Sequence, residues 1–92
     1  MLFESDEYKA AQNAAKHGVP FEYAAWVFLD PRRLTSEDTR RDYGEERWLA
    51  LGEIEGRLFA VGYTRRGTII RLISARKANE REQRKYDETL ST

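Results

Sequence analysis

Apolar residues recur with a helical period in two stretches near the start of the chain. The first stripe predicts an amphipathic helix over residues 7–17, with Asp6 at the N-cap position and Gly18 where a left-handed residue can end it. The second stripe predicts a helix over about 20–28, which Pro31 stops because proline disfavours helical geometry in the residue before it.

Three β-rich runs bounded by glycines fill the middle of the chain, at residues 46–52, 57–64 and 68–75. Short loops containing Gly56 and Gly67 join them, which favours an antiparallel meander. A further strand is possible around 33–36, and residues 2–5 could open a short edge strand. We expect the rest of the polar segment 31–46 to be a mobile loop.

The end of the chain predicts one more helix, from about 80 to 89. Asn79 and Glu82 have the spacing of a capping box, while only Tyr86 and Leu90 are apolar on one side, so we expect loose packing. The element order predicts a single domain over 1–92 of the α+β class. Two N-terminal helices and a C-terminal helix pack on a three- to four-stranded antiparallel sheet, with one face uncovered or shared with a partner.

Composition narrows the class of protein. The 92 residues carry a formal net charge of zero and no cysteine, which excludes disulfides and thiolate metal sites. The charge is unevenly placed, because residues 1–56 sum to −5 (7 basic, 12 acidic) and residues 57–92 to +5 (9 basic, 4 acidic). Such asymmetry indicates nucleic-acid contact or an interaction segment, and the alternative is a set of solvated faces whose charges average out. The acidic N-terminus has no apolar signal region and no run approaches a membrane span, so we expect a cytoplasmic protein without membrane contact.

Several motifs extend over nearly the whole chain: a run from Phe3 to Phe21 containing Lys16-His17-Gly18-Val19, the pair Asp30-Pro31, the segment Gly44-Glu45-Glu46-Arg47, and a run from Arg71 to Tyr86 containing Ile73-Ser74-Ala75-Arg76. In this order and spacing they resemble the BrnT family of ribonuclease toxins, although Ser5 stands where that family usually has tryptophan. The resemblance implies a RelE-like fold, toxicity through RNA cleavage, and a cognate antitoxin encoded alongside.

Two candidate catalytic residues have a structural alternative each. His17 could act as a general base or phosphate contact, or could interact with the carbonyls at the end of its helix. Arg71 lies between two isoleucines on the same side of a strand if side chains simply alternate. Either it pairs with Glu45 or Glu46, or it faces a phosphate, for which the planar guanidinium is suited.

The other candidates are mainly basic. Arg76 is expected to hold phosphate, and Glu46 is either a base or the partner of an arginine. The remaining predicted RNA-binding residues are Lys16, Arg65, Lys77, Arg81 and Tyr86, the last because RNA bases stack on aromatic rings. A solvated basic helix is the alternative for this C-terminal group.

Taken with the resemblance, which implies RNA cleavage, these residues lead us to expect an endoribonuclease that needs neither metal nor cofactor. His17 or Glu46 would take the proton of the 2′-hydroxyl, while Arg71, Arg76 and Arg65 hold the phosphate. The alternative is a binding module that grips RNA or protein without chemistry. We expect a BrnA-like, DNA-binding antitoxin to cover Arg71, Arg76 and Tyr86, and DNA to be contacted only through that antitoxin.

Overall fold

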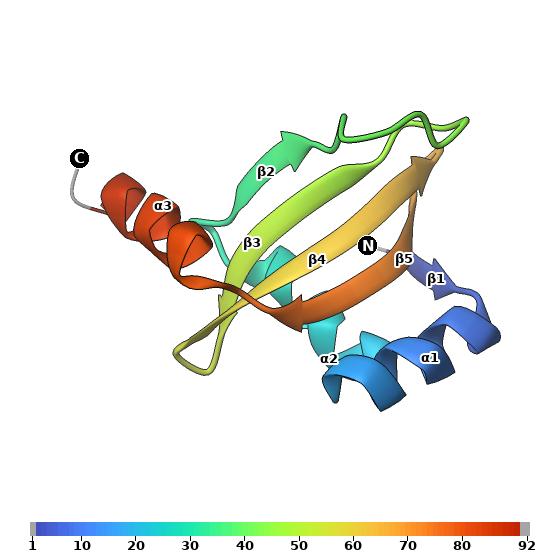
Figure 1. The fold of residues 1–92 in the computed structure, drawn as a ribbon, viewed down its shortest axis with the longest axis horizontal. Coiled ribbons are helices and arrows are strands. Elements are labelled where there is room, and N and C mark those ends of the chain that lie inside the picture. The colour runs from blue at the N-terminus through green and yellow to red at the C-terminus, as the bar shows by residue number, and fades with distance from the viewer. Residues whose placement is uncertain (1, 91–92) are drawn as a thin grey trace.

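A strongly twisted five-stranded sheet forms the centre of the molecule, with helices on both of its faces (Figure 1). The computed structural model describes residues 2–90. Along this part of the chain the elements are β1 (Leu2–Ser5), α1 (Glu7–His17), α2 (Phe21–Ala24), the 3-10 helix η1 (Ala25–Leu29), β2 (Leu34–Glu37), β3 (Trp48–Ile54), β4 (Arg57–Arg66), β5 (Ile69–Lys77) and α3 (Glu80–Leu90).

The strands are ordered β1-β5-β4-β3-β2, so the sheet is mixed. β1 runs parallel to β5, whereas the other neighbours are antiparallel. The α+β class is confirmed, but the prediction of three or four antiparallel strands was wrong. β1 has only four residues, too few to show a clear alternation of apolar and polar positions. Its place in the sheet depends on pairing with a strand almost 70 residues later in the chain.

The first helix has the predicted bounds and caps. The carboxylate of Asp6 accepts hydrogen bonds from the backbone N–H groups of Tyr8 and Lys9, at 2.8 and 3.2 Å. At the other end Gly18 adopts a left-handed conformation (φ 70°) and donates its N–H to the carbonyl of Ala14 at 2.8 Å. Both ends are therefore satisfied by local chemistry.

The second helix has the expected extent but two geometries. Its first part, α2, is α-helical, and its second part, η1, is a 3-10 helix that ends at Leu29. Val27 and Phe28 are buried in the core, whereas Ala25 is only partly buried. A 3-10 helix has three residues per turn, so the inward positions shift relative to the α-helical pattern.

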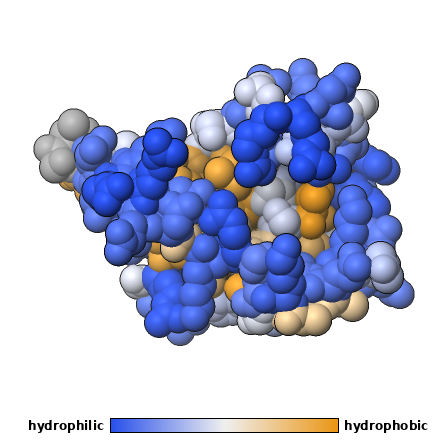
Figure 2. Space-filling view, viewed as in Figure 1, coloured by the Kyte–Doolittle hydropathy of each residue, from blue (hydrophilic) through white to orange (hydrophobic). Residues whose placement is uncertain are grey.

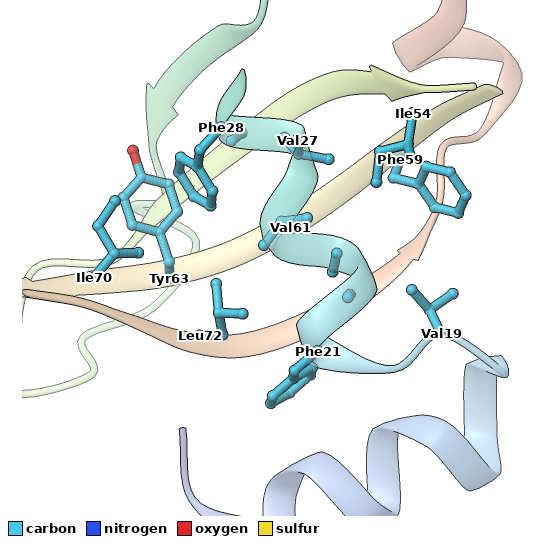
Figure 3. Packing of buried hydrophobic residues seen from close by; sticks show 13 residues of the cluster. Val19, Phe21, Val27, Phe28, Ile54, Phe59, Val61, Tyr63, Ile70 and Leu72 are labelled. Carbon is cyan, nitrogen blue, oxygen red and sulfur yellow. The ribbon is translucent and has the colours of Figure 1, made fainter. Parts of the chain in front are cut away.

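The main core lies between this helical layer and the sheet. Figure 3 shows side chains of α2 and η1 pointing towards those of β4 and β5. Phe28 packs edge-on against Tyr63, with 5.0 Å between ring centroids. Gly52 lets η1 approach β3 closely, because an added Cβ would lie 2.7 Å from a methyl carbon of Val27. This helical layer covers one face of the sheet, and the other face is partly open.

α3 covers one end of that other face. Tyr86 is fully buried there, and a small cluster surrounds it, made of Leu51, Leu58 and Ala60. The capping box is confirmed, since Asn79 Oδ1 accepts from the Glu82 N–H at 2.8 Å and Glu82 Oε1 from the Asn79 N–H at 3.0 Å. The expectation that the last helix buries little is confirmed, because Tyr86 is the only buried residue among the described residues 80–90 of α3 and Leu90 is 41% exposed. One buried tyrosine anchors the helix.

Hydrogen bonds organise the loop between β2 and β3, which we had expected to be mobile. The Asp38 N–H donates to the carbonyl of Arg47 at 2.7 Å, which closes the loop. The carboxylate of Asp38 accepts from the guanidinium of Arg40 and the hydroxyl of Tyr43. The hydrogen bond from Arg40 holds the pKa of Asp38 far below its usual value. Thr64 Oγ1 donates to the carbonyl of Glu46 at 2.6 Å and ties the loop to β4.

Candidate functional site

A groove with a cationic lining runs between α1 and β5. Its described lining comprises Lys9, Gln12, Asn13, Ala15, Lys16, His17, Arg47, Ile73 and Ser74. Two lysines, an arginine and a histidine converge here, and no carboxylate side chain is among these lining residues. Figure 2, which faces the sheet surface beside α3, shows pale and apolar atoms in a hollow bordered by hydrophilic ones. The positively charged lining of the groove suits the binding of a polyanion. We call this feature the cationic groove.

Asn13 fixes the two walls of the groove against each other. Its side-chain amide pairs with the backbone of Ala75 as a neighbouring strand would, accepting from the N–H at 3.0 Å and donating to the carbonyl at 2.8 Å. It also donates to the carbonyl of Val19 at 3.1 Å. Asn13 is buried, and these bonds satisfy the edge of β5 beyond the point where β1 ends. The last turn of α1 is therefore held rigidly beside the strand.

The floor of the groove is a bulge in the sheet. Gly62 pairs with Ser74, but Tyr63 pairs with Leu72, so Ile73 is an extra residue in β5. An added Cβ at Gly62 would lie 2.6 Å from Ser74 Oγ. Bulges often re-aim side chains beside active sites, and a glycine inside a strand is the sequence signal for one.

Arg47 is the functional candidate that the sequence analysis missed. Its guanidinium stacks on the ring of Tyr43, with the carbon 4.0 Å from the ring centroid. Its Nε is buried without a hydrogen-bond partner, although Oε2 of Glu45 lies 3.5 Å away. A buried charged donor left unsatisfied is costly and calls for an explanation. The available signal was the position of Arg47 directly before β3, in the motif Gly44-Glu45-Glu46-Arg47.

Lys16 and His17 line this groove together, as expected for neighbours at the end of α1. Both also lie in the last helical turn, where the carbonyl ends of the helix favour positive charge. The functional and structural interpretations of His17 are therefore compatible. Glu46 lies outside the groove; its side chain is exposed and lines the adjoining hollow of the β2–β3 loop.

Arg71 pairs with a different residue from the one expected. Its Nη1 lies 3.2 Å from Oε1 of Glu4, directly opposite on the parallel strand β1. The proposed pairing with Glu45 or Glu46 was wrong, because the prediction allowed an edge strand at residues 2–5 but did not place it beside the strand that carries Arg71. The bulge also breaks the simple alternation: Arg71 and Ser74 face the same side, three residues apart, since their partners on β4 are two apart.

Arg76 is held by a bidentate ion pair with Glu82. Its Nη1 and Nη2 lie 2.7 and 3.0 Å from the two carboxylate oxygens. The hydrogen bonds to Glu82 raise the pKa of Arg76, and those from Arg76 lower the pKa of Glu82. Arg76 thus connects β5 to the N-terminal turn of α3. Its side chain lies on the same face of β5 as that of Ser74.

The remaining predicted residues do not form one cluster. Arg65 is exposed near the end of β4, opposite Ile70, whereas Lys77 and Arg81 are exposed at the α3 end of the sheet. About 20 Å separates residues six apart on a strand, such as 71 and 77. Tyr86 is completely buried and offers no ring face for a base to stack on. The structure brings together only Lys16 and His17 of the predicted set, and adds Lys9 and Arg47.

Metal-binding residues do not gather in the described part of the chain, where no three His, Cys, Asp or Glu side chains are placed to share an ion. None of the helices in residues 2–90 has the length and apolar character of a membrane span.

The fold and the groove together define an α+β protein whose surface is suited to binding a polyanion. Residues 6–82 match the family model of the ribonuclease toxin BrnT of type II toxin–antitoxin systems, so the chain belongs to the BrnT toxin family. A search among curated proteins gave no match. Membership implies an antitoxin as partner.

Proposed function

We propose that the chain is an endoribonuclease whose reaction takes place in the cationic groove. The observation that carries this proposal is Arg47, whose buried Nε lacks a hydrogen-bond partner in a groove that also contains Lys16 and His17. An anionic phosphate would offer acceptors to these donors. The family of ribonuclease toxins to which the chain belongs supports RNA as the source of that phosphate.

The proposed reaction needs only groups that the groove, the RNA and solvent water supply. His17 takes the proton of a ribose 2′-hydroxyl while that oxygen attacks the adjacent phosphorus. The bond from phosphorus to the 5′-oxygen breaks, and this oxygen takes up a proton from solvent water, to which His17 returns the proton it has taken. The products are a 2′,3′-cyclic phosphate and a 5′-hydroxyl end. Arg47 and Lys16 stabilise the extra negative charge of the phosphorane.

Arg71 and Arg76, which the sequence predicted to hold the phosphate, have a secondary role in this proposal. Arg71 and Arg76 lie on the open face of β5 on either side of Ser74, but each already donates a hydrogen bond to a carboxylate, which the Nε of Arg47 does not. We propose that they guide the RNA strand along the sheet. Arg81 extends this basic surface at the α3 end, whereas Lys77 and Arg65 are in register with the core residues Phe59 and Ile70 and so belong to the other face of the sheet. Glu46 is the alternative base if the RNA spans both hollows.

The test is cleavage of a defined RNA by the purified chain in excess chelator. We expect products with cyclic phosphate ends, and a loss of cleavage in His17→Ala and Lys16→Ala while each variant loses no more than about 1 kcal/mol of unfolding free energy, the usual contribution of a charge at a helix end. Retention of RNA without cleavage by the wild-type chain would instead favour a non-catalytic binding module. Cleavage that stops with chelator would overturn the proposed independence from metal.

In the cell, we propose that cleavage inhibits translation in the cytoplasm until the cognate antitoxin neutralises the toxin. We expect that antitoxin to be BrnA-like and to contact operator DNA itself, with the toxin reaching DNA only through it. Co-expression with the antitoxin should relieve growth inhibition, and the isolated toxin should show no sequence-specific DNA binding.

A further inference from the structure

The outer side of η1 presents two large apolar side chains. Trp26 is 58% exposed and Leu29 is 66% exposed. Residues three apart eclipse each other in a 3-10 helix, so these two side chains project in the same direction. They form a ridge on the helical layer, turned away from the core that Val27 and Phe28 fill.

Two hollows adjoin this ridge. The first is lined by Phe3 and Ala25 together with the ridge residues, and Phe3 is itself 38% exposed. The second is lined by the ridge residues and by Tyr23, Asp30, Pro31, Glu53, Ile54 and Glu55. We call the ridge and its two hollows the η1 patch. Exposed apolar surface with a polar border is typical of an interaction site.

The border of the η1 patch is acidic. Asp30, Glu53 and Glu55 line the second hollow, and neither hollow has a lysine or arginine among its described lining residues. The donors to these carboxylates are neutral: the Tyr86 hydroxyl and backbone N–H groups for Asp30, and the Tyr23 hydroxyl for Glu55. The positive charges of Arg57 and Arg32 favour the ionised forms of Tyr23 and Asp30, but neither arginine is among the described residues that line the hollows. The negative charge therefore remains available to a basic partner.

The η1 patch and the cationic groove belong to different faces. η1 and α2 lie behind the sheet in Figure 1, whereas the groove is formed on the face that carries α3, beside Gly62 and Ser74. RNA is repelled by the acidic border of the patch, and the same holds for an anionic membrane surface. A partner on this side must be a protein segment with apolar anchors and positive charge.

We infer that the η1 patch is the docking surface for a basic amphipathic segment of the cognate antitoxin. Its apolar side chains cover Trp26, Leu29 and Phe3, and its lysines or arginines face Glu53 and Glu55. The inference rests on the proposed function in one respect, namely that an antitoxin neutralises this toxin. Affinity then arises mainly on the helical face, while the groove is blocked by another part of the same antitoxin.

The experiment compares the double variant Trp26→Ser/Leu29→Ser with the full-length wild-type chain. Both residues are exposed, so the fold should persist; Tyr8→Ser is the control, because Tyr8 is a 70% exposed apolar residue on α1, away from the patch. The measurements are the Kd for the co-expressed cognate antitoxin by calorimetry, RNA cleavage by the free chain, and oligomeric state by ultracentrifugation. Glu55→Lys is measured in addition at low and high salt.

We expect the double variant to bind the antitoxin at least about 30-fold more weakly, as for a central tryptophan of an interface, with RNA cleavage and the Tyr8→Ser affinity unchanged. Glu55→Lys should weaken binding and reduce its salt dependence. Unchanged affinity of the double variant overturns the inference, and so does a wild-type homodimer that the double variant abolishes. If no chain cleaves RNA but antitoxin binding still depends on the patch, the proposed ribonuclease activity fails and the docking surface stands.

Discussion

The hydroxyl of Tyr86 donates a hydrogen bond of 2.5 Å to Oδ2 of Asp30. The same oxygen accepts the Glu53 N–H at 2.8 Å, so one carboxylate joins α3, β3 and the residue that follows η1. Burial, followed by this bond to Asp30, raises the pKa of Tyr86. Burial opposes charge on Asp30, but the Glu53 N–H, Tyr86 and Arg32 outweigh it and lower its pKa. The pair attaches a helix that has few other apolar contacts.

Tyr86→Phe should lower the free energy of unfolding by about 1.5–3 kcal/mol, because it removes a hydrogen bond to a charged group and leaves the ring in place. Urea denaturation measures this change. Tyr8→Phe is the matched control, since the Tyr8 hydroxyl bonds only to the exposed Gln12 and should contribute little. Equal stabilities of the two variants would show that the Tyr86–Asp30 bond does not hold α3.

Acid should destabilise the protein through its lowered carboxyl pKa values. The Glu82 pKa lies below its usual 4.5, chiefly because Arg76 donates hydrogen bonds to it. A depressed folded-state pKa contributes stability above the unfolded-state value that is lost as pH falls through the folded-state pKa. Unfolding free energy should therefore decline below about pH 4.5, and Asp30 and Asp38 act in the same direction.

Glu82→Gln isolates one part of that acid response. Glutamine at this position can still accept the Asn79 N–H, so the cap is retained while the ion pair with Arg76 is lost. We expect about 1.5–3 kcal/mol less stability at pH 7, and a smaller difference from wild type at pH 3. A constant difference across this pH range, measured by urea titration, would contradict the role of the ion pair.

Sequence reasoning succeeded where local chemistry decides the structure and failed where distant pairing does. Asp6 and Gly18 define α1, and Asn79 with Glu82 begins α3, because each interaction spans only a few residues. By contrast the parallel pairing of β1 and its Glu4–Arg71 ion pair depend on residues 67 positions apart. No local pattern indicates such a contact.

The site shows the same division. Lys16 and His17 are neighbours in the sequence and line the same groove. Arg47 reaches the groove from before β3, so its proximity to α1 follows only from the sheet order. Tyr86 was assigned to RNA because basic residues surround it in sequence, but the helix turns those residues to solvent and the tyrosine into the core.

Asn13→Ala should be among the more destabilising substitutions on α1. It leaves the N–H and carbonyl of Ala75 without their side-chain partner at a buried position. Each buried group left unsatisfied costs about 1–3 kcal/mol. Gln12→Ala, one position earlier and exposed, is the control and should change stability by less than about 0.5 kcal/mol. Hydrogen exchange should also show the Ala75 amide exchanging faster in Asn13→Ala, and unchanged protection there would contradict the pairing.

Arg47→Ala should reduce RNA cleavage by about 10²–10³-fold, the usual effect of removing one donor to a developing oxyanion. Because the donor is proposed to act on the phosphorane, the loss should appear in kcat more than in KM. Arg47→Lys keeps the charge but not the planar fork, so we expect only partial rescue. Arg41→Ala is the control; its guanidinium also lies near Tyr43, at 5.8 Å, but Arg41 is not part of the groove lining.

A structural role for Arg47 predicts a different result. If the guanidinium only supports the loop by stacking on Tyr43, then Arg47→Ala lowers the urea midpoint and Tyr43→Leu lowers cleavage by the same factor. If it binds phosphate, Tyr43→Leu keeps most of the activity, because the positive charge remains. Arg47→Ala then loses far more cleavage than its urea midpoint accounts for, because only the stacking on Tyr43 and the 3.5 Å contact with Glu45 contribute to stability. Full activity in a folded Arg47→Ala variant would remove this residue from the proposed reaction.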